Sequence, residues 1–351
     1  MAEPANSPSI VSARPLLSHR GAERPELSDA VLSLDVSLPM DGRGNAEIRL
    51  LNWGRRAGEA DFQWQDIALG DDFSIAFLDS GRQVFAGQVT ALEERYGQGA
   101  PMLVLLVEDP LHRLAKARRS RAWEEQGIDD VIASIAAEHG LSADVSVSST
   151  SADWYQQNET DLNFIARLCR RHDVPLRIHD GGLLARPPET DPAPVAVSPR
   201  SNADEIRIIA DLSHQVTGSG LRGWDFASAD RVEHETERLQ PPASGETAAD
   251  LLGSLGWGGG EWLGGASARG AAEARDRAVA ALHRQATRFL TGEILLRGDP
   301  ALAAGGEIEL DGVSPRLRGR YRVTRLHHRF DGDNGFVSHL RVERSDWSPA
   351  R

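Results

Sequence analysis

The sequence predicts a mainly β fold with inserted α+β segments. Runs of alternating apolar and polar residues recur through the first 110 residues and again after residue 200, as expected for half-buried strands. Turn-forming residues separate these runs. Helical spacing of apolar residues is confined to three segments between and inside the two β regions. Two β regions separated by inserts suggest an internal duplication.

The first β region begins near residue 30. Leu32, Leu34, Val36 and Leu38 alternate with polar residues, so we expect these four side chains on one face of a strand. Similar short runs follow at residues 46–50, 73–77, 84–92 and 102–107. Several short strands with turn residues between them predict a small antiparallel barrel or sandwich.

The pattern becomes helical after residue 110. Four apolar residues recur at helical spacing from Ile128 to Ile135, and Gly140 stands where a helix C-cap glycine belongs. A second helix is predicted after Thr160, which is a suitable N-cap. Residues 174–185 complete a compact α+β unit with a hairpin. The apolar face of the second helix carries Leu162, Ile165, Leu168 and Cys169.

The second β region begins after a proline-rich linker at residues 187–199. Strand-like runs between residues 206 and 224 precede a glycine-rich stretch at residues 236–265. The longest helical pattern follows, from Ser267, which can cap its start, to Leu290. Strand-like alternation then returns and continues almost to the end of the chain.

Composition and charge exclude several classes of protein. The 351 residues carry a formal net charge of -13, which disfavours a nucleic-acid-binding protein. Cys169 is the single cysteine, so neither an intrachain disulfide nor a multi-cysteine zinc site can form. No segment has the apolar core of a signal peptide or of a membrane helix. We therefore expect assembly in the cytoplasm, without membrane insertion or sequence-specific nucleic-acid binding.

Several segments, taken in order, resemble one known family. They are residues 84–92 (VFAGQVTAL), 108–114 (EDPLHRL), 128–141 (IDDVIASIAAEHGL), 155–172 (YQQNETDLNFIARLCRRH), 216–225 (VTGSGLRGWD), 272–299 and 317–330 (LRGRYRVTRLHHRF). Together they resemble the late control gene D family of phage proteins. That family includes tail hub proteins and is related to the N-terminal part of VgrG proteins of type VI secretion. The resemblance covers roughly residues 26 to 348.

The resemblance implies two small tube-like β-barrel domains that lie side by side, with α/β segments inserted. Residues 216–225 would open the second barrel. The expected parts are a flexible N-terminal arm (1–25), the first barrel (26–117), an α+β domain (118–189), the second barrel (190–232 and 291–348), and an inserted glycine-rich loop with a long helix (233–290).

The resemblance also implies a homotrimer. Its three subunits would form a ring of quasi-sixfold symmetry between a sixfold inner tube and a threefold central spike. Because the sequence ends at Arg351, just after the last hub-like strand, we expect the spike, of OB-fold or needle type, to be a separate chain. Other expected partners are the inner tube or a tube-initiator protein, other baseplate proteins and the tape measure. The protein would end as part of a phage tail or injection particle, which can be released from the cell.

Two tryptophans are the candidate interface residues. Trp257 and Trp262 stand in the glycine-rich stretch, and exposed aromatic side chains commonly anchor protein interfaces. A locally packed loop is the alternative. No residue is assigned a catalytic, cofactor-binding or metal-binding role.

Other constellations have structural interpretations. His327 and His328 are neighbours on a predicted strand and should point to opposite faces, which disfavours a shared metal site. The turn that begins at Asp331 lacks the glutamate of a calcium loop and predicts a hairpin. Cys169, three residues before His172, falls on an apolar helix face and predicts a buried core residue.

Two sets of charges were also weighed. Glu159 and Asp161 could form a glycosidase pair, but their place at a helix start is explained by capping and the helix dipole. The basic run at residues 112–121 predicts a solvated face or a salt-bridged subunit contact.

The sequence thus predicts a structural protein and not an enzyme. The expected function is that of the central hub of a baseplate, in a phage, a tailocin or another contractile injection system. One alternative is a module in which residues 119–186 bind peptidoglycan or the tape measure. A cell-wall hydrolase is the other, and it would need a cleft with paired carboxylates.

Overall fold

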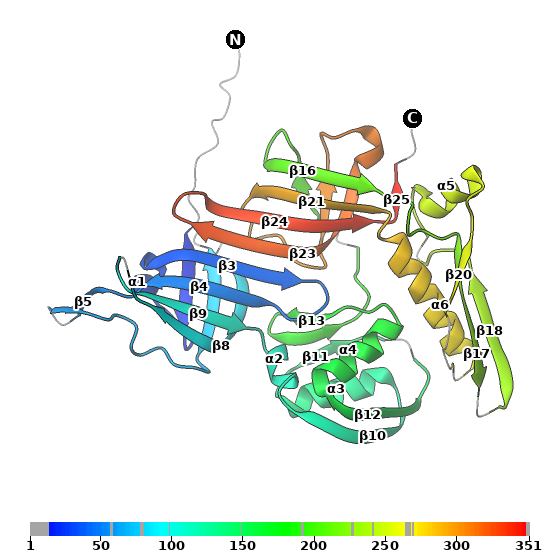
Figure 1. Ribbon diagram of the computed structural model, residues 1–351, viewed down its shortest axis with the longest axis horizontal. Coiled ribbons are helices and arrows are strands. Elements are labelled where there is room, and N and C mark those ends of the chain that lie inside the picture. Colours follow the sequence, from blue (N-terminus) through cyan, green and yellow to red (C-terminus); the bar gives the residue numbers. More distant parts are fainter. Residues whose placement is uncertain are drawn as a thin grey trace, which may run out of the picture.

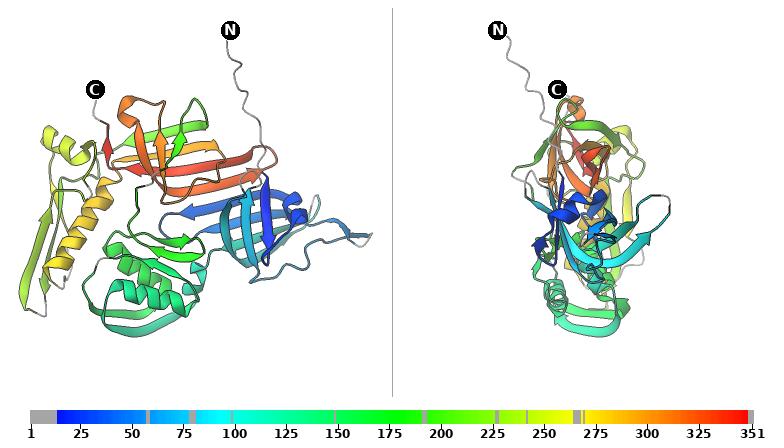
Figure 2. Two further views of the ribbon diagram at one scale, coloured as in Figure 1. Left: turned by 180° about the vertical axis from the view of Figure 1, so that it is seen from behind. Right: turned by 90° about the vertical axis from the view of Figure 1, so that its left-hand side faces the viewer.

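The computed structural model describes residues 14–56, 59–77, 81–97, 99–147, 149–190, 193–225, 228–240, 242–263, 268 and 270–348. Strands dominate this part of the chain, so the mainly β class with α+β inserts is confirmed. Figure 1 shows an elongated molecule, with strand β5 (Gly54–Arg56) at one end and β18 (Asp230–Thr236) at the other. Turned by 90°, the same molecule is much narrower (Figure 2).

One 13-stranded sheet runs through most of the molecule. Its strands, in spatial order, are β16 (Ala203–Ala210), β21 (Leu290–Arg297), β24 (Gly335–Arg344), β23 (Gly319–Asp331), β3 (Val31–Pro39), β4 (Asn45–Leu51), β9 (Met102–Glu108), β8 (Gln83–Arg95), β7 (Asp72–Phe77), β1 (Pro15–His19) and β2 (Ala22–Glu23). Strand β22 (Glu307–Leu310) branches from β23 and pairs with β15 (Val195–Val197).

The two β regions of the sequence meet inside this sheet. Strand β23 pairs antiparallel with β3, from the partners Arg325 and Pro39 to Asp331 and Ser33. We call this line of pairing the seam. Strands β3, β4, β9, β8, β7, β1 and β2 form the first β unit, and β15, β16, β21, β22, β23 and β24 form the second. The seam was not predicted, because alternation along a strand does not reveal which strand lies beside it.

Each β unit has its own hydrophobic core. Leu34 and Val36 of β3 are buried in the first core, as the alternation predicts. Leu32 is 41% exposed, because a register shift between Val31 and Ser33 takes it out of the alternation. The second core is centred on buried residues of the closing strands, including Tyr321, Val323, Leu326, Leu340 and Val342.

The α+β unit lies below the sheet in Figure 1. Its helices α3 (Ile128–Glu138) and α4 (Asp161–Arg171) begin and end close to the predicted residues. The hydroxyl of Thr160 accepts a hydrogen bond from the backbone N–H of Asn163 at 3.2 Å, which confirms the N-cap. Gly140 follows α3 with φ +70°, a conformation that glycine adopts without strain.

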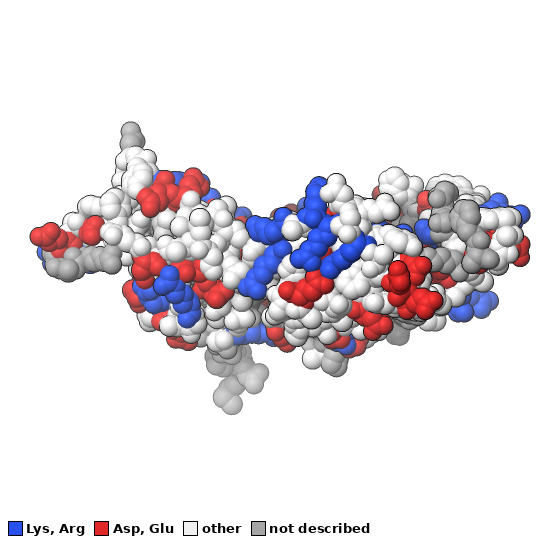
Figure 3. Space-filling model, turned by 90° about the horizontal axis from the view of Figure 1, so that it is seen from below, with Lys and Arg blue, Asp and Glu red and all other residues white. Residues whose placement is uncertain are grey.

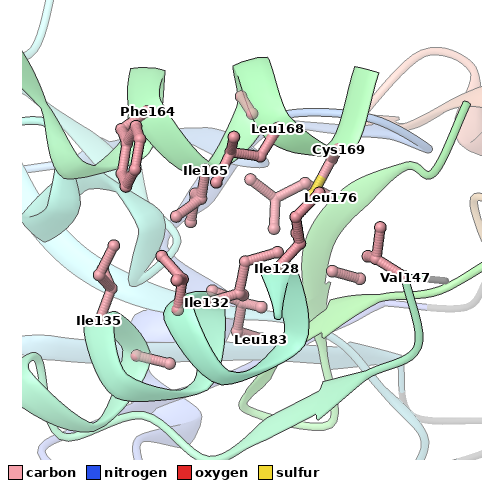
Figure 4. Packing of buried hydrophobic residues seen from close by; sticks show 14 of the residues in the cluster. Ile128, Ile132, Ile135, Val147, Phe164, Ile165, Leu168, Cys169, Leu176 and Leu183 are labelled. Atoms are coloured by element: carbon pink, nitrogen blue, oxygen red, sulfur yellow. The ribbon is translucent and has the colours of Figure 1, made fainter. Parts of the chain in front are cut away.

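Two layers of strands cover these helices. The predicted hairpin is confirmed as β13 (Leu176–His179) and β14 (Gly182–Ala185), with β11 (Ala143–Val145) parallel to β14. Strands β10 (Arg118–Gln126) and β12 (Ala152–Thr160) form a separate ribbon. Figure 4 shows the core between α3, α4 and the hairpin, and Cys169 lies within it, so the prediction of a buried cysteine is confirmed.

The N-terminal expectation is wrong in part. We expected a flexible arm through residue 25, but residues 15–19 form β1, which pairs with β7 from Pro15 to His19. Leu17 is completely buried, and its burial together with this strand pairing explains why residues 15–19 are not part of a flexible arm. The short helix α1 (Pro25–Asp29) follows. Residues 1–13 lie outside the described residues.

The insert also differs from expectation. Strand β17 (Gly218–Asp225), which we placed at the opening of the second barrel, pairs instead with β18 and with β20 (Gly260–Leu263). This small sheet packs against helix α6 (Ala271–Ala286) through Leu221, Val232, Ala268 and Ala274. The alternation in β17 identified a strand but not the sheet that contains it. The predicted cap Ser267 lies outside the described residues.

The remaining elements are short. They are β6 (Glu59–Asp61), α2 (Leu111–Leu114), β19 (Glu246–Thr247), α5 (Ala248–Leu255), the 3-10 helix η1 (Pro315–Leu317) and β25 (Asp346–Trp347). Within the described part of the chain, we find no helix with the length and apolar character needed to cross a bilayer.

Candidate functional site

The two candidate tryptophans lie in different environments. Trp257 follows helix α5 and is 67% exposed, whereas its backbone N–H donates to the carbonyl of Leu252 at 2.9 Å. Trp262 lies in β20, with its ring against Gly220 and the Arg222 guanidinium 3.7 Å from the ring centre. Trp257 is therefore available to a partner, whereas Trp262 already packs within the insert. An interface role for either residue remains a prediction.

A second exposed aromatic group escaped the sequence reasoning. Trp53 and Tyr96 are 42% and 62% exposed, and Phe62 lies between them with ring centres at 5.2 and 6.0 Å. Trp53 and Phe62 flank the β5–β6 hairpin, and strand β5 lies at the opposite end of the molecule from helix α5, which Trp257 follows (Figure 1). The three rings are separated in sequence, so no local pattern could have grouped them.

Beside the seam, apolar side chains of the two β units pack against each other. Phe77 of β7 stacks on Phe336 of β24, with ring centres 3.6 Å apart. His328 lies beside both rings, is completely buried, and shares a hydrogen bond of 2.9 Å with Ser338. Burial and the neighbouring His327 lower the pKa of His328 to about 3, so the ring is neutral. His327 is partly exposed, so the prediction of opposite faces is confirmed.

Part of the basic run is neutralised within the chain. Arg119 and Arg121 both bind Glu138, at 2.6 and 2.7 Å, and Arg121 also binds Asp161 at 3.0 Å. Figure 3 shows basic and acidic side chains close together on this lower face. Arg119 and Arg121 are thus paired within the chain, which was not predicted, and a salt-bridged contact with another subunit remains a prediction.

The remaining reactive side chains occupy structural positions. Glu159 pairs with Arg167 at 2.6 Å, and the Asp161 side chain is only 2% exposed, so these two carboxylates do not share an open cleft. Burial raises the pKa of the Cys169 thiol to about 12, which disfavours a thiolate nucleophile. Among the described residues, no group of three His, Cys, Asp or Glu side chains is placed to hold a metal ion.

The turn after β23 is a hairpin. The Asp331 carboxylate accepts hydrogen bonds from the backbone N–H groups of Asp333 and Asn334, at 2.9 and 2.7 Å. These bonds fix the turn that leads into β24. The hairpin prediction for this segment is therefore confirmed.

Asp109 is a buried acid at the end of β9. Its carboxylate accepts hydrogen bonds from the backbone N–H groups of Gly44 and Leu111. Burial raises the pKa of Asp109 to about 6, and the two backbone hydrogen bonds only partly oppose this. Because the folded state binds this proton more tightly than the unfolded state, Asp109 favours folding less as pH rises from about 4 to about 6.

We expect Asp109→Asn to remove this pH dependence. The stability of the wild-type chain relative to the variant should fall by about 2 kcal/mol between pH 4 and pH 7, because the pKa of Asp109 is about 6 in the folded state and has its ordinary, lower value in the unfolded state. Urea unfolding of both proteins at several pH values measures the difference, in which titrations common to both proteins cancel. Parallel stability curves would show that Asp109 has an ordinary pKa.

Comparisons with known proteins give a family and a fold. A family model described as the Alg8 N-terminal domain matches residues 57–331. No curated protein matches the sequence.

Three solved structures illustrate the fold. The 43 kDa tail protein of prophage MuSo2 from Shewanella oneidensis has a TM-score of 0.71 and 12% identity, over 95% of this chain and 98% of that chain. The tail protein from Neisseria meningitidis MC58 has a TM-score of 0.71 and 10% identity, over 95% and 97% of the two chains. The E. coli c3393 protein, a component of the type VI secretion system, has a TM-score of 0.62 and 13% identity, over 95% and 79%.

Proposed function

We propose that the chain, which belongs to the Alg8 N-terminal domain family, is a structural subunit of a tail-like particle, because it has the fold of phage tail proteins. Specifically, it forms the central hub of the baseplate of a contractile phage-like tail or injection system. The observation that carries this proposal is the single sheet spanning both β units, in a chain whose fold matches a phage tail protein along almost its entire length.

The two β units suggest how such a hub joins different symmetries. Each subunit contributes two β units that are held side by side by the seam. A homotrimer therefore presents six units to a sixfold inner tube, while its three identical chains match a threefold spike. A closed ring of this kind needs a heterologous contact between unlike surfaces of neighbouring subunits. The exposed aromatic groups at Trp53 and Trp257 are candidates for such surfaces.

The hub acts by binding its partners and has no catalytic step. The partners are a spike protein, the inner tube or a tube-initiator protein, and other baseplate proteins. The particle assembles in the cytoplasm, and the hub leaves the cell as part of the particle if the particle is released. The resemblance of the sequence to the late control gene D family supports a mechanical role. In that role the hub joins the tube to the spike around a central channel.

Two other functions are weaker. A cell-wall hydrolase would need paired carboxylates in an open cleft, and the acids weighed for this role are engaged in ion pairs. A binding module built on residues 119–186 has a specific observation in its favour, since Tyr155, on the outer ribbon formed by β10 and β12, is 53% exposed. Its partner would be peptidoglycan or the tape measure.

The mass of the purified protein in solution tests the hub. We expect light scattering to give a trimer, or a monomer that forms a complex of three hub chains and three spike chains when a candidate spike protein is added. A monomer that does not bind the spike protein would contradict the proposed hub function. Binding of that monomer to peptidoglycan or to a tape-measure protein would then support the module.

A further inference from the structure

A pocket of about 410 Å³ lies where three parts of the chain meet. Strands β7 and β8 of the first β unit form one wall, and the turn of the β13–β14 hairpin forms another. Pro300 and residues 302–304, in the loop that joins β21 to β22 of the second β unit, form a third wall. This volume is within the usual range of small-ligand sites. The wall carries apolar side chains, among them Leu38, Phe85 and Leu302, together with several charged groups.

Arg177, on β13, is the unusual charged group of this wall. Its side chain forms no hydrogen bond and no ion pair with any described residue, and its Nη1 atom is buried without a partner. The guanidinium lies against Gly305, and burial together with the nearby Arg322 and Arg186 lowers its pKa. Buried polar groups in proteins are nearly always paired, so an unpaired guanidinium calls for an explanation.

The other charged groups of the pocket wall have partners. Asp72 accepts a hydrogen bond from the Gln88 amide at 3.1 Å, and the Arg113 guanidinium donates to the same amide group at 3.0 Å. Asp109 accepts from two backbone N–H groups. Arg177 is therefore the charged group of the wall that is left without a partner, and because a guanidinium only donates, a ligand that pairs with it must be an acceptor.

We propose that this pocket binds a carboxylate, with Arg177 as its anchor. A guanidinium presents paired N–H donors in a plane that matches the two oxygens of a carboxylate. The apolar part of the wall suits the carbon chain that bears the carboxylate. The carboxylate comes either from an acidic side chain of a partner protein or from a free organic acid. The site exists in the single chain, so it does not depend on the assembly proposed above.

Binding of small probes to the isolated full-length chain tests the site. We expect saturable binding of glutarate in ligand-observed NMR, and no binding of the uncharged glutaramide. Arg177→Gln should weaken glutarate binding at least tenfold, because charge-assisted hydrogen bonds are lost. Absence of saturable glutarate binding, or equal binding by Arg177→Gln, would overturn the proposal.

Two variants separate ligand binding from folding. Arg177→Met should unfold at the same or a higher temperature than the wild type, because it removes a buried cation without a partner, yet it should lose glutarate. Arg186→Gln is the matched control, since Arg186 pairs with Asp144 and Glu189 and does not line the pocket. It should bind glutarate normally. Loss of binding in Arg186→Gln as well would indicate nonspecific attraction and contradict the site.

The source of the carboxylate is read from a second probe. The tripeptide Ala-Glu-Ala with both ends blocked presents a single side-chain carboxylate, as a partner protein would. Tighter binding of this peptide than of glutarate supports a protein partner, whereas tighter binding of glutarate supports a free acid. Both results support a carboxylate site.

Discussion

Asp161→Ala should destabilise the α+β unit by about 3–5 kcal/mol, the usual loss when one member of a buried ion pair is removed. The Asp161 carboxylate accepts hydrogen bonds from His139 at 2.9 Å, Gln156 at 2.8 Å and Arg121 at 3.0 Å. It thereby links the end of α3, both strands of the outer ribbon and the start of α4. The variant would leave three donors around a buried site without their acceptor.

The pKa of Asp161 agrees with this role. Burial raises it, but the hydrogen bonds from His139 and Gln156 and the charge of Arg121 bring the pKa below its ordinary value. The carboxylate is therefore ionised at neutral pH and its contribution to stability is lost as pH falls.

Glu159→Ala is the matched control for Asp161→Ala. Glu159 pairs with Arg167 at the surface, so its removal should cost less than about 1 kcal/mol. Urea unfolding measures both losses, followed by tryptophan fluorescence, to which the buried Trp154 of the same unit contributes. Equal losses in the two variants would show that the Asp161 network contributes no more than a surface ion pair.

The second large effect is expected beside the seam, where rings of the two β units stack. Phe77→Ala should lower the stability of the chain by about 3–5 kcal/mol, because it removes a completely buried ring and leaves a cavity. Unlike other core phenylalanines of the first β unit, Phe77 stacks on a ring of the second unit, that of Phe336. The loss should therefore loosen the joint between the units as well as one core.

A double-mutant cycle isolates this joint. Phe77→Ala and Phe336→Ala should show a coupling energy of about 0.5–1.5 kcal/mol, as stacked rings do. Phe73, in the same strand, stacks on His19 of the first unit and serves as the control partner for Phe336. A Phe77–Phe336 coupling no larger than the Phe73–Phe336 coupling would mean that the stacking does not hold the units together.

Local features of the fold could be predicted from the sequence. The helices α3 and α4, the cap at Thr160 and the buried Cys169 depend on spacing within a dozen residues, which the sequence displays directly. The strand β3 was also found, but the register shift that exposes Leu32 has no signature in the alternation. Segments with regular periodicity are thus predictable where a single element determines the pattern.

Contacts between distant segments could not be predicted. The seam depends on pairing between β23 and β3, and the insert depends on β17 choosing β18 and β20 as neighbours. In both cases the pairing of the strands is determined by packing between segments that are distant in the sequence. The same holds for candidate sites. Trp257 was identified because it is a tryptophan in a glycine-rich stretch. Arg177 was missed because the sequence of a strand does not reveal whether an arginine has a partner.

The seam also constrains when the chain can fold. Its hydrogen bond between Ser37 and His327 joins residues separated by 290 positions. During synthesis the ribosome therefore releases β3 long before its neighbour β23 exists, and the edge of the first unit stays unpaired throughout. Pairing over such a distance is slow, since the entropy of closing the loop is lost before the contacts form. We expect the seam to be the last part of the sheet to form, and the nascent chain to be most prone to misassembly until it does.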